Sequence, residues 1–183
     1  MVLLFSGHMI DAPDRATPRF PPQMEVVAKD AINEVLEKLD AGPSDLAICS
    51  GACGGDLLFA EAALARGLSL EMYLPFDVGT FATKSVDFAG GNWHERFEAA
   101  CAASHLHVMP DERGELPKGA DPYEQNNLWM LEAASRFGAD KVEFICLWNG
   151  QGGDGPGGTQ HLMQTVTQRQ GRSHWLDTTR LFK

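Results

Sequence analysis

A glycine-rich segment near the middle of the chain has the residue types and spacing of an anion-binding turn. It reads SGACGGD, from Ser50 to Asp56, and lies between an apolar run predicted as a strand (46–50) and one predicted as a helix (56–66). Where a strand ends and a helix begins, unpaired backbone N–H groups and the positive end of the helix dipole converge. Glycines Gly51, Gly54 and Gly55 carry no side chain that would keep an anion away. The segment therefore predicts a phosphate site, and the alternative is that its glycines only permit a tight turn.

A second glycine-rich segment follows the apolar run 142–148, which is predicted as a strand. It contains GPGGT, with Gly157, Gly158 and Thr159 at the start of a predicted helix. Thr159 is expected to cap this helix, and its hydroxyl can reach a phosphate. Two such turns on one parallel sheet predict a common anionic ligand between them.

Polar residues near the ends of other predicted elements can complete such a site. Ser6, Gly7 and His8 end the first predicted strand, 2–5, and a proline-rich loop follows. In that loop Arg15 and Arg19 could clamp a phosphate or carboxylate, although pairing with Asp11 or Asp14 is an equal alternative. Adjacent amides begin a predicted helix at 123–137 and suit either capping or contacts to a purine edge or ribose hydroxyl, namely Asn126 and Asn127.

Two carboxylates of the central helix are candidates for catalysis. Asp56 begins the helix, where a capping role is expected. Glu61 stands out on an otherwise apolar helix, and a solvated gap between layers is its alternative explanation. In an enzyme, Asp56 or Glu61 would act as base or nucleophile, with His8 or His161 as the acid.

The composition limits the class of protein. With 183 residues and 44% hydrophobic content, the chain is expected to form one domain over 1–183. The formal net charge of −10 argues against a nucleic-acid surface. No apolar run approaches the roughly 20 residues that cross a bilayer, and the amino terminus lacks the basic region of a signal peptide. We therefore expect a cytoplasmic protein with no membrane partner, and a homo-oligomer is left open.

The cysteines indicate free thiols in a reducing compartment, because no C-x-x-C pair is present. The spacing of Cys49 and Cys53 lacks nearby metal-ligating partners, so neither a metal nor another cofactor is expected beyond a nucleotide-type ligand. Alternation of apolar strands and amphipathic helices predicts an α/β fold of the Rossmann-like, doubly wound type. It would have about five to six mostly parallel strands with helices on both faces. The stretch 77–93 shows no clear period and is a possible flap over the site, and 110–122 is predicted as a polar loop.

Several of these motifs, taken in order, resemble the SLOG superfamily. They are the strand followed by SGH, the segment SGACGGDLLFAEAALARG, the helix YEQNNLWMLEAAS, and a strand ending in WNG followed by GPGGT. The resemblance covers 2–171 and is nearest to the YpsA-type and LOG-like members of this group of Rossmann-like domains. It implies that the two glycine-rich turns bind a nucleotide or a nucleotide-derived ligand.

The late motif departs from the LOG enzymes, in which P-G-G-x-G-T-x-x-E supplies a glutamate for cleavage of the N-glycosidic bond. Here Gln160, His161 and Leu162 follow Thr159, and the turn contains no such carboxylate. We therefore favour a nucleotide sensor or ligand-binding domain. The alternatives are an N-glycosidase or phosphoribohydrolase-like enzyme acting on nucleoside monophosphates, and a scaffold for protein contacts.

Overall fold

A single parallel sheet organises the computed structural model, which describes residues 1–152 and 158–183. In this part of the chain six strands lie in the order β4-β3-β2-β1-β5-β6. All five strand pairings are parallel, as the sequence predicted. The strands are β1 (Val2–Gly7), β2 (Leu46–Cys49), β3 (Ser69–Leu74), β4 (His105–Val108), β5 (Val142–Trp148) and β6 (Arg172–Asp177).

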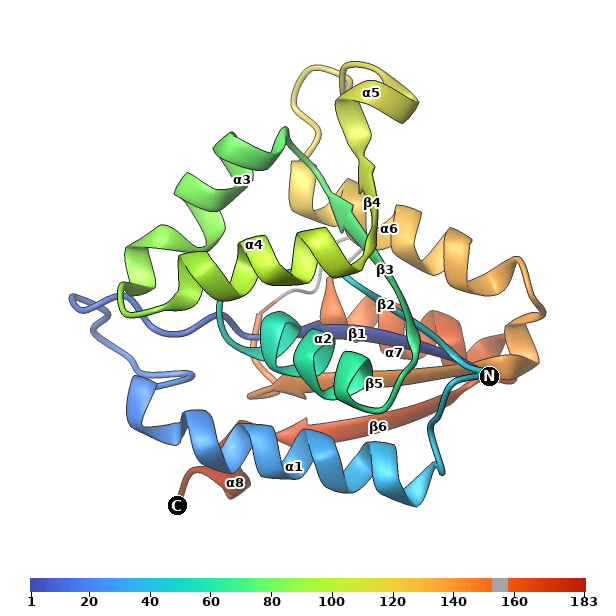
Figure 1. Cartoon of the computed structure of the whole chain (residues 1–183), viewed down its shortest axis with the longest axis horizontal. Coiled ribbons are helices and arrows are strands. Elements are labelled where there is room, and N and C mark those ends of the chain that lie inside the picture. Colours follow the sequence, from blue (N-terminus) through green and yellow to red (C-terminus); the bar gives the residue numbers. More distant parts are fainter. Residues whose placement is uncertain (153–157) are drawn as a thin grey trace.

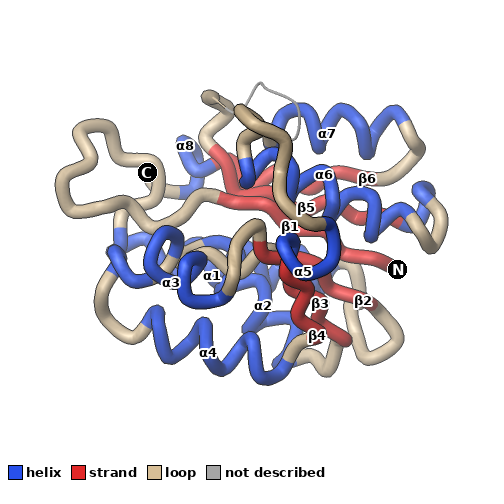
Figure 2. The backbone as a smooth tube through the Cα atoms, turned by 90° about the horizontal axis from the view of Figure 1, so that it is seen from above, coloured by secondary structure: helices blue, strands red, loops and turns tan. Residues whose placement is uncertain are grey.

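Helices cover both faces of this sheet, which confirms the predicted Rossmann-like α/β architecture. In Figure 1, α1, α2 and α4 lie in front of the strands, and α6 and α7 lie behind them. The view from above in Figure 2 shows the same two layers flanking the sheet. The helices are α1 (Glu25–Lys38), α2 (Gly55–Ala65), α3 (Val78–Ser85), α4 (Trp93–Ala103), α5 (Met109–Arg113), α6 (Pro122–Ser135), α7 (Thr159–Gln168) and α8 (Thr178–Leu181). Single 3-10 turns form η1 (Pro22–Met24), η2 (Asp87–Ala89) and η3 (Ala139–Lys141).

Alternating side chains of β1 pack into two separate hydrophobic cores, one on each face of the sheet. Leu3 and Phe5 pack with the helices in front, whereas Val2 and Leu4 pack in the cluster behind, and all four are buried. A strand covered on both faces must be apolar at every position, because neither face meets water. This explains the uninterrupted apolar run from which the strand was predicted.

Three short helices depart from the predicted irregular segments. The stretch 77–93 contains α3, which Asp77 caps by accepting a hydrogen bond from the Thr80 N–H at 2.9 Å. Phe81 of α3 is fully buried and packs on Phe97 of α4, with the ring centroids 5.6 Å apart. The predicted polar loop 110–122 begins inside α5, and α8 follows the last strand. Helices this short carry no full apolar period, so periodicity cannot reveal them.

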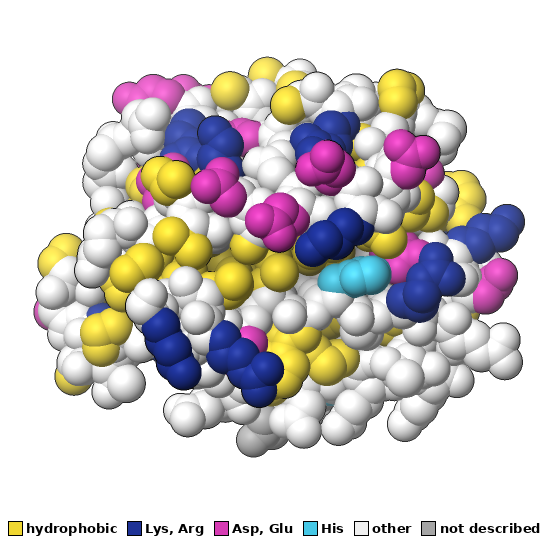
Figure 3. All heavy atoms as spheres, turned by 90° about the horizontal axis from the view of Figure 1, so that it is seen from below, with side chains coloured by type: hydrophobic (Ala, Val, Ile, Leu, Met, Phe, Trp, Pro, Cys, Tyr) yellow, Lys and Arg dark blue, Asp and Glu magenta, His cyan; other side chains and the backbone are white. Residues whose placement is uncertain are grey.

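The outer edge of β6 and the adjoining α1 carry exposed hydrophobic side chains. Figure 3, which looks at the molecule from this side, shows hydrophobic side chains in a band across the face with charges of both signs around it. On these elements Val26, Val27 and Trp175 are exposed. None of the helices in the described residues is both long and apolar enough to cross a membrane.

The loop that follows β1 closes tightly over the glycine-rich turn that follows β2. The Ile10 N–H donates to the Cys53 carbonyl at 3.1 Å, and the Gly55 N–H donates to the His8 carbonyl at 3.1 Å. Gly54 has a φ of 101° and a ψ of −127°, a conformation open essentially to glycine alone. A Cβ on Gly54 would lie 2.7 Å from the Ile10 nitrogen and 2.9 Å from the His8 oxygen. The two segments can meet only because this position has no side chain.

We predict that Gly54→Ala destabilises the fold more than Gly90→Ala. Gly90 has a comparable conformation, with φ 66° and ψ −154°, but a Cβ there would meet no atom within 4 Å. Both substitutions strain the backbone, whereas only the first also forces the two loops apart. We expect an extra loss of about 2 kcal/mol in the free energy of unfolding, measured by urea denaturation. Equal losses in the two variants would contradict the tight closure.

Candidate functional site

The carboxyl ends of β1 and β5 lie side by side at the point where the strand order reverses. Ser6 is in register with Cys146, and Gly7 with Leu147. From β1 the chain builds β2, β3 and β4 outward on one side, and it then crosses over to place β5 and β6 on the other. In open α/β sheets, ligands bind outside the carboxyl ends of the strands at such a reversal. The half-buried Ser6, Gly7 and His8 lie at this point, as the sequence predicted for the first strand's end.

His8 joins the two strand ends. Its backbone N–H donates to the Leu147 carbonyl at 2.9 Å, and its Nε2 accepts a hydrogen bond from the Asn149 N–H at 3.1 Å. Burial, followed by the nearby positive charge of Arg19, lowers the pKa of His8 to about 4. The imidazole is therefore neutral near pH 7, in agreement with its role as an acceptor. A histidine of this kind is a poor general acid at neutral pH.

The proline-rich loop after β1 is shaped by one buried carboxylate. Asp11 is 8% exposed and accepts hydrogen bonds from the backbone N–H groups of Arg19, at 2.8 Å, and Phe20, at 2.9 Å. It also forms an ion pair with the Arg15 Nε at 3.0 Å. The pairing of Arg15 with Asp11 was the alternative to a ligand role. The same carboxylate fixes the loop so that Arg19 turns to the carboxyl edge of the sheet.

Arg19 lines a cavity of about 340 Å³ at this edge. Its Nε is buried and has no acceptor among the described residues. Burial, followed by repulsion from Arg15, lowers the pKa of Arg19. The positive charge of Arg19 is therefore not fully balanced by the groups around it. The lining comes from the first loop, the end of β5 and the last helix, and it comprises Thr17, Pro18, Arg19, Pro21, Asn149, Gln151, Thr178, Thr179 and Phe182. An acceptor-rich anionic group would complete this site.

The first glycine-rich turn does not offer its amides to a ligand in this structure. The Ala52 N–H donates to Asp56 Oδ2 at 3.3 Å, the Cys53 N–H to the Ser85 carbonyl at 2.9 Å, and the Gly55 N–H to the His8 carbonyl. All residues from 50 to 60 are buried. The geometry therefore supports the alternative given for this turn, in which its glycines permit close approach of the chain. Gly51 agrees, because a Cβ there would lie 2.2 Å from the Met72 methyl carbon.

Asp56 lies beneath this turn and is 6% exposed. Its Oδ1 has no hydrogen-bond partner among the described residues. Burial raises the pKa of Asp56 to about 7, against the opposing effect of the hydrogen bonds from the Ala52 and Gly51 amides. Gly54, not Asp56, is the N-cap of α2, and no side chain caps this helix, so the predicted capping role of Asp56 is wrong. The Asp56 side chain accepts a hydrogen bond from the Ala52 N–H and lies away from the lining of the cavity beside Arg19.

Ser50 and Asn126, predicted at the same edge, are brought together. The Asn126 Nδ2 donates to the Tyr73 carbonyl at 2.8 Å and approaches the Ser50 Oγ at 3.4 Å. Asn126 is 1% exposed, and its Oδ1 accepts no hydrogen bond from the described residues. Asn127, next on α6, is half-buried. Ser50, Asn126 and the Tyr73 carbonyl form a polar cluster under α6, near the ends of β2 and β3.

Glu61 lies apart from every other predicted site residue. It forms an ion pair with Arg96 of α4, with distances of 2.6 Å to Nε and 2.8 Å to Nη2. Arg96 also contacts Glu25 of α1 at 2.7 Å. Arg96 therefore ties three helices together on the front of the sheet, and Glu61 has no place at the carboxyl edge.

The second glycine-rich turn is described only in part. Gly157 lies outside the described residues, Gly158 is buried, and Thr159 is half-buried. Gly158 is the N-cap of α7, and Thr159 is already its first helical residue. The predicted cap at Thr159 is therefore wrong, because the helix begins at Thr159 itself, one residue earlier than a cap at this position would require. Whether this turn contacts a ligand stays a prediction.

Several residues at the cavity were not assigned a role from the sequence. Asn149 follows β5 directly, and Thr178 and Thr179 belong to α8. A polar residue after a predicted parallel strand is a recognisable signal, and Asn149 could have been found from it. The threonines follow the last strand in an element too short to predict. Among the described residues, no group of three histidines, cysteines or carboxylates is arranged to hold a metal ion.

Comparisons with known proteins identify no family. No protein-family model matches the chain, and no curated protein sequence matches it. Among solved structures, the chain is similar to the X-ray structure of TM1055, a structural genomics target, with 12% identity and a TM-score of 0.39. The match covers 79% of this chain, which spans 59% of that one. The Rossmann-like fold is therefore established by the sheet order itself.

We predict that the stability of the protein decreases as the pH rises, because of Asp56. Its pKa is raised from 3.8 to about 7 in the folded protein, so the unfolded chain loses this proton first. The folded state is thus progressively penalised as the pH rises from about 4 to about 7, by up to roughly 4 kcal/mol in total. In Asp56→Asn this penalty is absent.

The measurement is urea denaturation of both proteins between pH 4.5 and 8.5. The difference in unfolding free energy, variant minus wild type, should grow with pH and level off above pH 7. Other titrating groups cancel in this difference, so a constant difference would show that Asp56 does not titrate in this range.

Proposed function

We propose that the protein binds a nucleotide or a nucleotide-derived small molecule at the carboxyl edge of the sheet, beside β1 and β5. The observation that carries this proposal is Arg19, whose side chain lines a cavity at the reversal of strand order and whose Nε has no acceptor among the described residues. The cavity volume of about 340 Å³ lies within the range of small-molecule sites. An anionic group of the ligand, phosphate or carboxylate, would form an ion pair with the Arg19 guanidinium.

The surrounding groups suit the rest of such a ligand. Asn149, Gln151 and Thr179 supply amide and hydroxyl groups that can contact a sugar or a base. Arg15 is paired with Asp11, and Ser50 and Asn126 are buried beneath α6, so these three residues lie outside the cavity lining. We assign the chain to the SLOG-like group as part of this proposal. Its anion would be bound by Arg19, whereas the sequence predicted that the first glycine-rich turn binds it.

Binding is favoured over N-glycoside cleavage by the position of the acids. The residues that line the cavity include no carboxylate among those described. Asp56 is enclosed under its own turn, and Glu61 is held by Arg96 on the front helices. Hydrolysis by a pair of acid and base residues would need at least one carboxylate at the ligand. The proposal is therefore a sensor or ligand-binding domain that needs no metal.

We predict that Arg19→Gln abolishes most of the ligand affinity. A hydrogen bond to a charged group contributes about 1.5–3 kcal/mol, which corresponds to a dissociation constant roughly 10- to 150-fold higher. Thermal shift against mono-, di- and cyclic nucleotides and ADP-ribose would find the ligand, since binding to the folded state raises the melting temperature. Titration calorimetry would then compare the dissociation constants of wild type and Arg19→Gln for that ligand.

Arg169→Gln is the matched control, because Arg169 is an exposed arginine at the end of α7. It should bind like wild type. A panel without any response, or equal affinity in Arg19→Gln and wild type, would refute the proposed site.

A further inference from the structure

The last strand, β6, is open along the side that faces away from β5. It is the terminal strand of the sheet, and it pairs with β5 at all six of its positions. A strand at the edge of a sheet presents a row of unpaired N–H and C=O groups to the outside. Among the described residues, no hydrogen bond joins the backbone of 172–176 to a loop or to a strand other than β5. This outer side of β6, here called the β6 edge, can therefore receive a further strand.

The β6 edge lacks the features that usually protect an edge strand. Natural proteins shorten such strands, interrupt them with proline or a bulge, place lysine on them or cover them. β6 has six residues in unbroken register, includes no proline or lysine, and none of its residues is buried. The strand at the opposite edge, β4, has only four residues and leads directly into α5. Of the two edges, that of β6 is the better suited to pairing.

Trp175 gives this edge an aromatic side chain that is held in place. Its indole Nε1 donates to the Trp148 carbonyl at 2.9 Å, and the two rings lie with their centroids 5.8 Å apart. The side chain is nevertheless 47% exposed. A ring that is already fixed loses little conformational entropy when a partner covers it, and tryptophan is enriched among the residues that dominate binding energy. The exposed part of Trp175 is therefore suited to a protein contact.

The surroundings of the β6 edge suit a second copy of the same surface. Figure 3 shows hydrophobic side chains in a band on this side, with charges of both signs around it. A surface of one sign would repel its own copy, whereas a mixed surface can match it. The two ends of β6 also carry opposite charges, Arg172 at the start and Asp177 at the end. In an antiparallel pair of β6 strands, each start lies near the end of the other strand, so unlike charges come near one another.

We propose that two copies of this chain form a dimer by pairing their β6 edges antiparallel, which joins the two six-stranded sheets into one. Such a contact is symmetric, with the same patch on both copies. The twofold axis is then perpendicular to the sheet, and one residue near the middle of the strand lies opposite its own copy. Trp175 occupies this position, because the other central residue, His174, is held by Glu143 at 2.7 Å. The proposal does not depend on the nucleotide site, since no residue of β6 lines the cavity beside Arg19.

Sedimentation velocity of wild type, Trp175→Lys and Phe137→Lys tests the contact. Trp175→Lys removes the central ring and places two positive charges opposite each other. Phe137 is the matched control, because it is 49% exposed and lies beside the starts of β1 and β2. Wild type and Phe137→Lys should be dimers at tens-of-micromolar concentration, and Trp175→Lys should have a dissociation constant at least about 10-fold higher. A monomeric wild type, or a folded Trp175→Lys that associates like wild type, would overturn the proposal.

Amide hydrogen exchange of wild type tests the strand pairing without any substitution, and it serves equally if Trp175→Lys does not fold. The outward amides of β6 should exchange slowly at concentrations that favour the dimer and rapidly after dilution. The amides of β1 are the internal reference, because β1 lies between β2 and β5 at every concentration. A dimer in which dilution leaves the exchange of β6 unchanged would place the interface elsewhere and overturn the proposal.

Discussion

The close approach of the loop after β1 to the turn after β2 is the constraint on which the rest of the carboxyl edge depends. Backbone hydrogen bonds join Ile10 to Cys53 and Gly55 to His8, and Gly54 leaves no room for a side chain between them. Amides that would otherwise be free at the start of α2 are therefore used within the protein. Because that position is closed, the open polar space at this edge lies beside β5, where Arg19 is found.

Electrostatics in this acidic chain are organised by local pairs. Arg96 joins α1, α2 and α4 through Glu25 and Glu61. Glu143, 1% exposed in β5, is neutralised by Arg172 and His174 of the neighbouring strand. Such compensation is needed wherever a carboxylate leaves water. Arg19 differs, since its buried Nε has no acceptor among the described residues. The charges that act on it are those of Arg15 and of Asp11, which is already bound to backbone amides.

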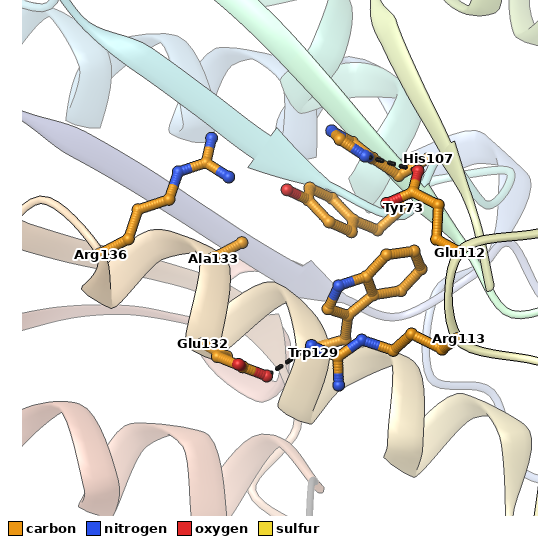
Figure 4. Close-up of a pocket in the computed structure, with 8 residues that line it drawn as sticks. All are labelled: Tyr73, His107, Glu112, Arg113, Trp129, Glu132, Ala133 and Arg136. Atoms are coloured by element: carbon orange, nitrogen blue, oxygen red, sulfur yellow. Dashed lines mark hydrogen bonds and ion pairs between the residues drawn. The ribbon is translucent and has the colours of Figure 1, made fainter.

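The two cavities differ in the charges that line them. The cavity beside Arg19 has one cation and several neutral polar groups, which suits an anion. The hollow between β3, β4, α5 and α6 is lined by two arginines and two glutamates (Figure 4), and all four already form pairs within the protein. Both are built where a short helix, α8 or α5, stands beside the sheet. These short helices follow the edge strands β6 and β4 (Figure 1). Each cavity therefore lies toward one side of the sheet.

The sequence by itself determined the elements whose side chains face a core. The apolar runs of β1, β3 and β5 and the apolar helix α2 can be recognised in the sequence, because an element buried on both faces is apolar at nearly every position. It also placed His8, Ser50 and Asn126 near strand ends, where a parallel sheet gathers them. The tertiary structure decided which backbone amides remain available, since that depends on which distant segment packs on the turn. It likewise decided that Glu61 contacts Arg96, 35 residues away, and that Thr178 and Thr179 line the same cavity as Arg19. Contacts of this kind join segments far apart in the chain, and no local pattern of residues encodes them.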